Sequence, residues 1–124
     1  MRKAVLVVLG LLVLTACATA APGTTRIRAD QISHQEIVDQ GPCSAWELVQ
    51  NLRPIWLRKR GQTSFTQETD VVVYLDSTRM GYRDSLRQID AHNIDYIEYM
   101  DARRATVRFG TGHVNGAILV HTQG

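Results

Sequence analysis

The spacing of apolar and polar residues predicts a short helix near the start of the folded region. Ser33 precedes Glu36 by three residues, which is the capping-box pattern, where each side chain accepts a hydrogen bond from the other residue's backbone amide. The helix runs through about Asp39 and ends near Gly41-Pro42, because neither of these residues favours its continuation.

A second capping box, Ser44 with Glu47, predicts a longer helix. Apolar residues recur along it every three to four positions, so one helical face is apolar. These residues are Trp46, Val49, Leu52 and Trp56. Pro54 leaves two possibilities: the helix ends at Leu52 and restarts with the proline in its first turn, or it continues with a kink. We interpret the two tryptophans as core residues in preference to a ligand-stacking pair.

Three strands are predicted in the second half of the chain. Residues 70–76 are β-branched and aromatic, and their near-continuous apolar character indicates cover on both faces. Residues 94–100 form a second strand and residues 116–122 the last one, while residues 63–66 allow a further brief strand. In the second strand, alternation places Ile94, Tyr96, Glu98 and Met100 on one face and Ile97 and Tyr99 on the other.

The segments between these strands are predicted as turns and helices. Residues 77–81 turn the chain, and residues 85–89 form a short helical turn. Residues 102–109 form a helix that ends at a Gly110 C-cap, with an inward face of Ala102, Ala105 and Phe109. The whole pattern predicts an α+β fold, a small mixed sheet of about three to four strands with two to three packed helices.

The start of the chain is predicted to be a lipoprotein signal peptide. Arg2 and Lys3 precede an apolar run, residues 4–14, that is about half the length needed to span a bilayer. The junction Leu14-Thr15-Ala16-Cys17 resembles a bacterial lipobox, which implies cleavage before Cys17 and lipidation of its thiol. The alternative is an ordinary secretory signal that is cut after Ala20.

This prediction divides the chain into three parts. Residues 1–16 are the signal peptide, residues 17–31 are a flexible tether without apolar periodicity, and residues 32–124 form one small domain. Ala18 after Cys17 is compatible with sorting to the outer membrane in diderm bacteria. We therefore expect an outer-membrane, lipid-anchored protein that faces the periplasm.

Charge and cysteine content narrow the function classes. Loss of Arg2 and Lys3 with the signal leaves 12 basic against 12 acidic residues, so the basic balance of the full chain gives no support for nucleic-acid binding. The basic cluster 58–60 is interpreted as a solvated turn. Cys43 is the only cysteine apart from Cys17. We therefore predict that it is a partly buried free thiol and that the chain has no disulfide framework.

The stretch FGTGHVNGAILVHT, residues 109–122, raises the question of a phosphate-binding loop. Gly110, Gly112 and Gly116 have a suggestive spacing, but such a loop precedes a helix whose N-terminus faces the phosphate. Here the predicted order is helix, loop, strand. We interpret the glycines as a helix cap and a turn, and we expect no nucleotide cofactor.

Catalytic and metal-binding patterns are weak. The four histidines, His34, His92, His113 and His121, lack the close spacing of zinc ligands. Asp76 and Asp101 each follow a predicted strand and are the candidates for a paired-carboxylate site, although acids are also common turn residues. We expect no catalytic residue, metal or cofactor, and a small carboxylate enzyme is the least favoured alternative.

Three motifs follow the upstream helix 46–57 in a fixed order. They are Val73-Tyr74-Leu75-Asp76; Leu86 and Ile89 with Ile94–Met100; and Ala105, Phe109-Gly110 and Asn115–Val120 with Thr122. Together with the upstream helix they span about 80 residues and resemble the plug domain of TonB-dependent outer-membrane receptors. The resemblance implies a plug-like domain in which Tyr74, Asp76, Gly110 and Gly116 have structural roles.

The departures from this family bear on function. Ser77 stands where the family usually has glycine, and we find neither a TonB box nor the long barrel of a receptor. The resemblance therefore implies a plug-like module rather than a transporter. We expect a non-enzymatic envelope protein that binds a protein or a small ligand through the loops 58–69 and 77–84. A structural or assembly accessory of an outer-membrane receptor or secretion complex is the alternative.

Overall fold

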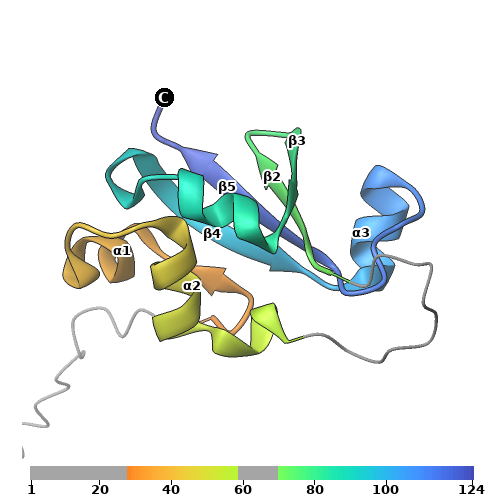
Figure 1. The fold of residues 1–124 in the computed structure, drawn as a ribbon, viewed down its shortest axis with the longest axis horizontal. Helices are drawn as coiled ribbons and strands as arrows, with labels where there is room; N and C mark the ends of the chain where they lie inside the picture. The colour runs from red at the N-terminus through yellow and green to blue at the C-terminus, as the bar shows by residue number, and fades with distance from the viewer. Residues whose placement is uncertain (1–27, 59–69) are drawn as a thin grey trace, which may run out of the picture.

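The structure is a computed structural model that describes residues 28–58 and 70–124. Within these ranges the chain is an α+β fold with one mixed five-stranded sheet (Figure 1). The strands are β1 (Gln31–Ile32), β2 (Val72–Leu75), β3 (Thr78–Tyr82), β4 (Ile94–Met100) and β5 (Ala117–Thr122). The helices are α1 (His34–Gln40), α2 (Ala45–Leu52) and α3 (Ala102–Phe109), with 3-10 turns η1 (Pro54–Leu57), η2 (Arg83–Gln88) and η3 (Ala91–Asn93).

The strand order is β1-β4-β5-β2-β3, so the last strand in sequence lies at the centre of the sheet. β5 pairs in parallel with β2 and antiparallel with β4. β1 pairs with the outer side of β4, and β3 pairs with the outer side of β2, both antiparallel. The predicted fold class is confirmed, but the predicted count of three to four strands was too low.

The two strands that the sequence pattern missed are the edge strands. β1 has two residues, and β3 falls where a turn was predicted at 77–81. The true turn is at Asp76 and Ser77, which both have positive φ, and β3 follows it at once. The prediction that residues 77–84 form a contact loop is therefore wrong, because β3 and the start of η2 occupy this segment.

Ordered structure also begins earlier than residue 32. Gln31 belongs to β1, and the carbonyl of Asp30 accepts a 2.8 Å hydrogen bond from the amide of Tyr99. Residues 30 and 31 are thus part of the sheet edge, and the predicted tether is too long at this end. The remaining predictions for 1–27, including Cys17, and for the brief strand 63–66 lie outside the described residues.

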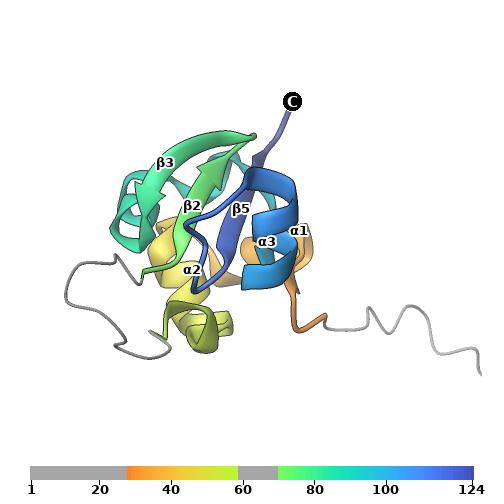
Figure 2. The same ribbon diagram turned by 90° about the vertical axis from the view of Figure 1, so that its right-hand side faces the viewer.

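Helices cover both faces of the sheet. On one face α1, α2, η1 and η2 pack over a core that includes Ile37, Leu48, Trp56, Leu86 and Ile97. On the other face α3 contributes Ala105 to a second core with Tyr74, Met100 and Leu119. Figure 1 shows α3 apart from the α1–α2 pair, in agreement with the two separate cores, and in the view of Figure 2, turned by 90°, α3 lies in front of α1. β2 is buried from Val72 to Tyr74, which confirms its predicted cover on both faces.

The faces of β4 differ from simple alternation. The pairing with β5 shifts between Ile94 and Tyr96, so Asp95 is an extra residue on the β4 side. This bulge moves Ile94 into the same core as Ile97, whereas the sequence pattern placed Ile94 with Tyr96 and Met100. One bulge reverses the face of every residue before it, because side chains alternate with period two.

The helix starts agree closely with prediction. Ser33 and Ser44 each accept a hydrogen bond from the amide of a glutamate three residues on, and both reciprocal bonds of the capping box are present. The ambiguity at Pro54 is settled in favour of a break, because α2 ends at Leu52 and η1 begins with the proline at its first position. Gly110 ends α3 with a positive φ, as predicted.

Candidate functional site

Two of the four residues singled out by the plug-like motifs are tied together through one histidine. The Tyr74 hydroxyl lies 2.8 Å from Nε2 of His113, and Nδ1 of that ring lies 2.8 Å from the carbonyl oxygen of Gly110. A carbonyl only accepts, so Nδ1 carries a proton, and in the neutral ring Nε2 accepts from the tyrosine. The Tyr74 ring also stacks on Phe109, with centroids 4.0 Å apart. These contacts fasten the end of α3 to β2.

Gly116, the third of these residues, lies where the chain enters β5. Its φ is +82°, and a Cβ placed there would lie 2.3 Å from the carbonyl oxygen of Met100. The neighbouring Asn115 carbonyl accepts a 3.0 Å bond from the Tyr99 hydroxyl. The glycine is therefore required by the close approach of two backbones, which is a structural role.

The glycine-rich stretch is a connector between α3 and β5. Gly110 donates its amide to the Thr106 carbonyl, and Gly116 donates its amide to the His113 carbonyl. The order helix, loop, strand is the predicted one. The helix end that faces this loop is a C-terminus, whose carbonyls repel a phosphate.

Asp76, the fourth residue, lies at the opposite end of β2. Its carboxylate accepts a 2.9 Å bond from the Thr122 amide and a second bond from the Thr122 hydroxyl. These hydrogen bonds hold the pKa of Asp76 below its usual value. The aspartate thus fastens the end of β5 to the β2–β3 turn.

The candidate carboxylate pair does not come together. Asp101 caps α3 by accepting a 2.8 Å bond from the Arg104 amide, directly after Met100, which pairs with the first residue of β5. Asp76 binds the last residue of β5, Thr122. The two carboxylates therefore lie at opposite ends of a six-residue strand, ~20 Å apart, and cannot act on one substrate atom.

The four histidines lie in three different environments. His113 is buried beside Tyr74, and His121 stacks on Tyr96 with centroids 4.2 Å apart. His34 and His92 line the same hollow, described below. Among the residues that the structure describes, no group of three or more His, Cys, Asp or Glu side chains is placed to hold a metal ion.

Between α1 and η3 lies a hollow of about 510 Å³, which we call the α1–η3 hollow. Its lining comes from four separate parts of the chain: α1, the Gly41-Pro42 turn, residues 90–92 and the C-terminal Gln123. Ile37 and Ala91 are buried in its wall, whereas Val38 is 58% exposed. The hollow therefore offers an apolar surface that is open to solvent.

Polar groups border this apolar surface. Asp90 caps η3 by accepting a 2.8 Å bond from the His92 amide, and Nδ1 of His34 lies 3.7 Å from the Asp95 carboxylate. Gln123 is held by a 3.0 Å bond from its amide to the Asn93 carbonyl. Apolar walls with a few polar groups at the edge are typical of sites for small ligands or for a single inserted side chain.

The sheet and two backbone bonds fix the shape of this hollow. The amide of Ala91 donates to the Cys43 carbonyl at 2.9 Å, and the amide of Ala45 donates to the Ile89 carbonyl at 2.8 Å. These bonds tie the segment before α2 to the segment before β4. The hollow has no local pattern in the sequence, because its lining is assembled across more than 80 residues, from His34 to Gln123. The available signal was Val38, a second apolar residue next to Ile37 in a short, otherwise polar helix.

The two tryptophans do not form a stacking pair. Trp56 is 4% exposed, stacks on Tyr99 with centroids 5.6 Å apart and donates a 3.2 Å bond to the Ala29 carbonyl. Trp46 lies at the edge of the core, where the Arg87 guanidinium sits 4.0 Å from its ring centroid. The core interpretation is confirmed for Trp56, and Trp46 packs against that core in part.

Cys43 is a free, partly buried cysteine, as predicted. Burial, together with the charges of Glu47 and Asp90, raises the pKa of its thiol. The thiolate is the reactive form, so this environment makes Cys43 a poor nucleophile at neutral pH.

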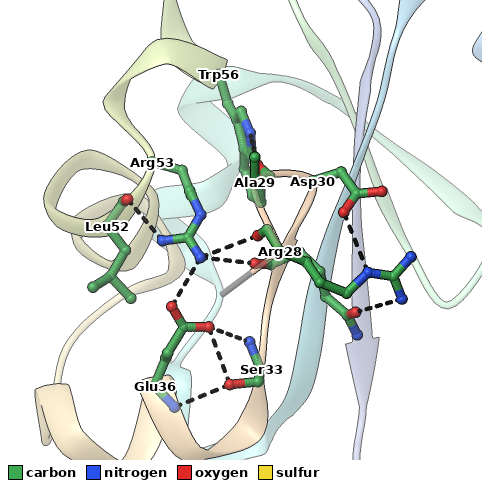
Figure 3. Close-up of polar contacts among 9 residues, drawn as sticks. Arg28, Ala29, Asp30, Ser33, Glu36, Leu52, Arg53 and Trp56 are labelled. Atoms are coloured by element: carbon green, nitrogen blue, oxygen red, sulfur yellow. Dashed lines mark hydrogen bonds and ion pairs between the residues drawn. The ribbon is translucent and has the colours of Figure 1, made fainter. Parts of the chain in front are cut away.

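Arg53, directly after α2, connects the first described residues of the chain to α1. Its guanidinium donates to the carbonyls of Arg28 at 3.2 Å and Gln31 at 3.0 Å, and to the Glu36 carboxylate at 2.8 Å (Figure 3). Figure 3 also shows the Ser33 capping box on the other oxygen of that carboxylate. The start of the domain is thereby held by side-chain bonds as well as by β1.

Comparison of this chain with protein-family models, with curated proteins and with solved structures finds no match. Within the described residues, no helix is both long enough and apolar enough to cross a membrane.

Proposed function

We propose that this protein is a non-enzymatic lipoprotein of the bacterial outer membrane that holds a plug-like binding domain in the periplasm. The lipobox Leu14–Cys17 is the observation that carries the proposal, because a cysteine directly after an apolar run and two small residues is the acceptor of the lipid. Described structure begins at Arg28, so the proposed anchor is eleven residues away from the domain.

The arrangement of the motif strands supports the plug-like interpretation. Val73–Asp76, Ile94–Met100 and Asn115–Val120 with Thr122 belong to three separate motifs, and the strands β2, β4 and β5 that hold most of these residues are neighbours in the order β4-β5-β2. Gly110 and Gly116 lie in the connection between β4 and β5, and both have positive φ. The motifs thus cover three adjacent strands of the five in the sheet.

The α1–η3 hollow is the proposed binding site. Its volume of about 510 Å³ lies within the range of small-ligand pockets, and the exposed Val38 offers an apolar contact at its edge. Binding of a small, mainly apolar molecule, or of one apolar side chain of a partner protein, fits this lining. The accessory role differs from ligand binding by requiring a membrane protein partner in fixed ratio.

The anchor is tested by replacing its cysteine. We expect Cys17→Ala to abolish incorporation of radiolabelled palmitate and to move the protein from the membrane to the soluble fraction, because no acyl chain is attached. Cys43→Ala is the matched control, since it removes a cysteine within the domain, and it should label and fractionate like the wild type. Unchanged palmitate labelling of Cys17→Ala would disprove the anchor.

The binding site is tested by a photo-crosslinking amino acid at position 38 of the membrane-bound protein in cells. We expect an adduct at position 38 in higher yield than at position 84, where the side chain is 80% exposed and outside the hollow. His34→Ala with His92→Ala should lower the yield at position 38. Equal yields at the two positions would contradict the site, and a stoichiometric protein adduct would favour the accessory role.

A further inference from the structure

The outer surface of α3 carries three arginines and one strongly exposed valine. Arg103, Arg104, Val107 and Arg108 line, with Met100, a hollow of about 350 Å³ on the side of the helix. Val107 is 85% exposed, the highest value among the exposed large apolar residues of the described chain. Its neighbours three and four positions before it on the same helical face are both arginines.

The sequence of α3 accounts for this arrangement. Ala105 is fully buried in the second core, so the helix has only a narrow apolar contact with the sheet. The arginines at 103, 104 and 108 and the valine at 107 are left on the solvent side. A helix with one face against a domain and a basic outer face that contains an apolar residue has the composition of a membrane-surface element.

The charges on this surface are only partly neutralised. Arg104 lies 3.6 Å from the Glu98 carboxylate, with its side chain 52% exposed. Arg108 lies over the ring of Phe109, 5.2 Å from its centroid, which leaves its positive charge in place. Guanidinium groups bind phosphate oxygens with two parallel hydrogen bonds, so this surface complements phosphate groups.

We propose that α3 is a docking surface for an anionic phospholipid bilayer, with the arginines at the headgroup phosphates and Val107 at the boundary of the acyl region. This inference rests on the proposed lipid anchor at Cys17. The lipid holds the domain at the membrane, and a basic patch adds an electrostatic attraction to anionic headgroups that orients the domain on the bilayer.

The geometry of the anchor allows this contact. The eleven residues from Cys17 to Arg28 reach at most about 36–40 Å when fully extended. A domain of this size has a radius of gyration of roughly 13 Å, so the anchor keeps the start of the domain within about one domain diameter of the bilayer. The α3 surface is thus held at high effective concentration next to the headgroups.

The test uses the lipidated full-length mature protein, reconstituted into vesicles of neutral phosphatidylcholine or of phosphatidylcholine with phosphatidylglycerol. Val107→Cys in a Cys43→Ala background carries an environment-sensitive fluorophore. We expect a blue shift and a gain in emission in the anionic vesicles alone, reversed by high salt because the attraction is screened. The same label at Val38→Cys, in α1, is the control and should give equal spectra in both vesicles.

Arg103→Gln with Arg108→Gln tests the charges and leaves the ion pair of Arg104 with Glu98 intact. With two cationic contacts removed, we expect the ratio of docked to undocked domain to fall about 30-fold. Spectra at position 107 that are the same in both vesicles, or that do not respond to the double variant, would overturn the docking surface.

Vesicle flotation separates this result from a failure of the anchor. A lipidated protein floats with both kinds of vesicle whether or not α3 docks, and loss of flotation from both would reject the anchor itself. Flotation with a silent label at position 107 rejects the α3 surface alone.

Discussion

Gly116 is the residue at which the packing of the sheet leaves no space for a side chain. Its positive φ is only part of the reason, because Gly112 has a positive φ as well. What distinguishes Gly116 is the Met100 carbonyl, which belongs to the neighbouring strand and cannot move without disturbing the β4–β5 pairing. The sequence identified a turn glycine, but crowding by a residue sixteen positions away became visible only in the fold.

We expect Gly116→Ala to lower the free energy of unfolding by about 3 kcal/mol, through strain at positive φ and contact with backbone. Gly112→Ala is the matched control, because its Cβ meets nothing within 4 Å, and it should cost about 1 kcal/mol. Urea unfolding of both variants measures the difference. Equal losses would show that the Met100 contact has no energetic weight.

Tyr74 and Asp76 illustrate what a motif can and cannot tell. Although the two residues are only two positions apart, their side chains reach opposite ends of β5: Tyr74 binds His113 before that strand, and Asp76 binds Thr122, its last residue. His113 was not singled out for this role, since a lone histidine in a loop has no local pattern that reveals a buried partner. Its function depends on a residue 39 positions earlier in the sequence.

At the scale of elements, interactions between residues close in sequence were sufficient to predict the helix ends, but they were insufficient to predict the edge strands of the sheet. The two capping boxes and Gly110 marked helix ends because each acts within four residues of its own position. β3 was missed because its sequence, Thr-Arg-Met-Gly-Tyr, lacks the apolar alternation of a strand and gains its structure by pairing with β2. The α1–η3 hollow was missed for the same reason, as it depends on long-range assembly.

The capping carboxylates predict how stability responds to acid. Burial of Glu36 opposes its ionisation, but hydrogen bonds from Ser33 and Arg53 outweigh burial and hold its pKa below the ordinary 4.5. Hydrogen bonds from Ser44 lower the pKa of Glu47 likewise. As the pH falls, the Glu36 and Glu47 carboxylates therefore take up protons in the unfolded chain before they do so in the folded one. The free energy of unfolding decreases as a result.

We expect the free energy of unfolding to be nearly constant from pH 7 to about pH 5 and to decrease below 4.5, down to the lowered pKa values. Glu36→Gln should reduce the slope of this decrease, and Asp84→Asn, at an exposed position, controls for the change in net charge. Chemical unfolding monitored by tryptophan fluorescence at several pH values gives the profile. A stability that rises below pH 4.5 would contradict the assignment.

At the scale of the whole molecule, the two faces of the sheet have different proposed tasks. The face under α1 and α2 holds the larger core, the Arg53 contacts to the entry of the chain and the α1–η3 hollow. The other face holds a smaller core under α3, whose outer side is basic. If α3 lies on the bilayer as proposed, the hollow is on the other side of the sheet and stays open to solvent.

The central position of β5 also affects the order in which the sheet can form during synthesis. Chains are synthesised from the N-terminus, so β1 to β4 are complete before residues 117–122 exist. Until then, β1 can pair only with β4 and β2 only with β3. The edges of β4 and β2 that face β5 in the finished sheet have no partner strand. A chain interrupted before residue 117 therefore leaves two strand edges open to proteases and to aggregation. When β5 is added it pairs with both β4 and β2, so only the full-length chain has no unpaired strand edge in the middle of the sheet.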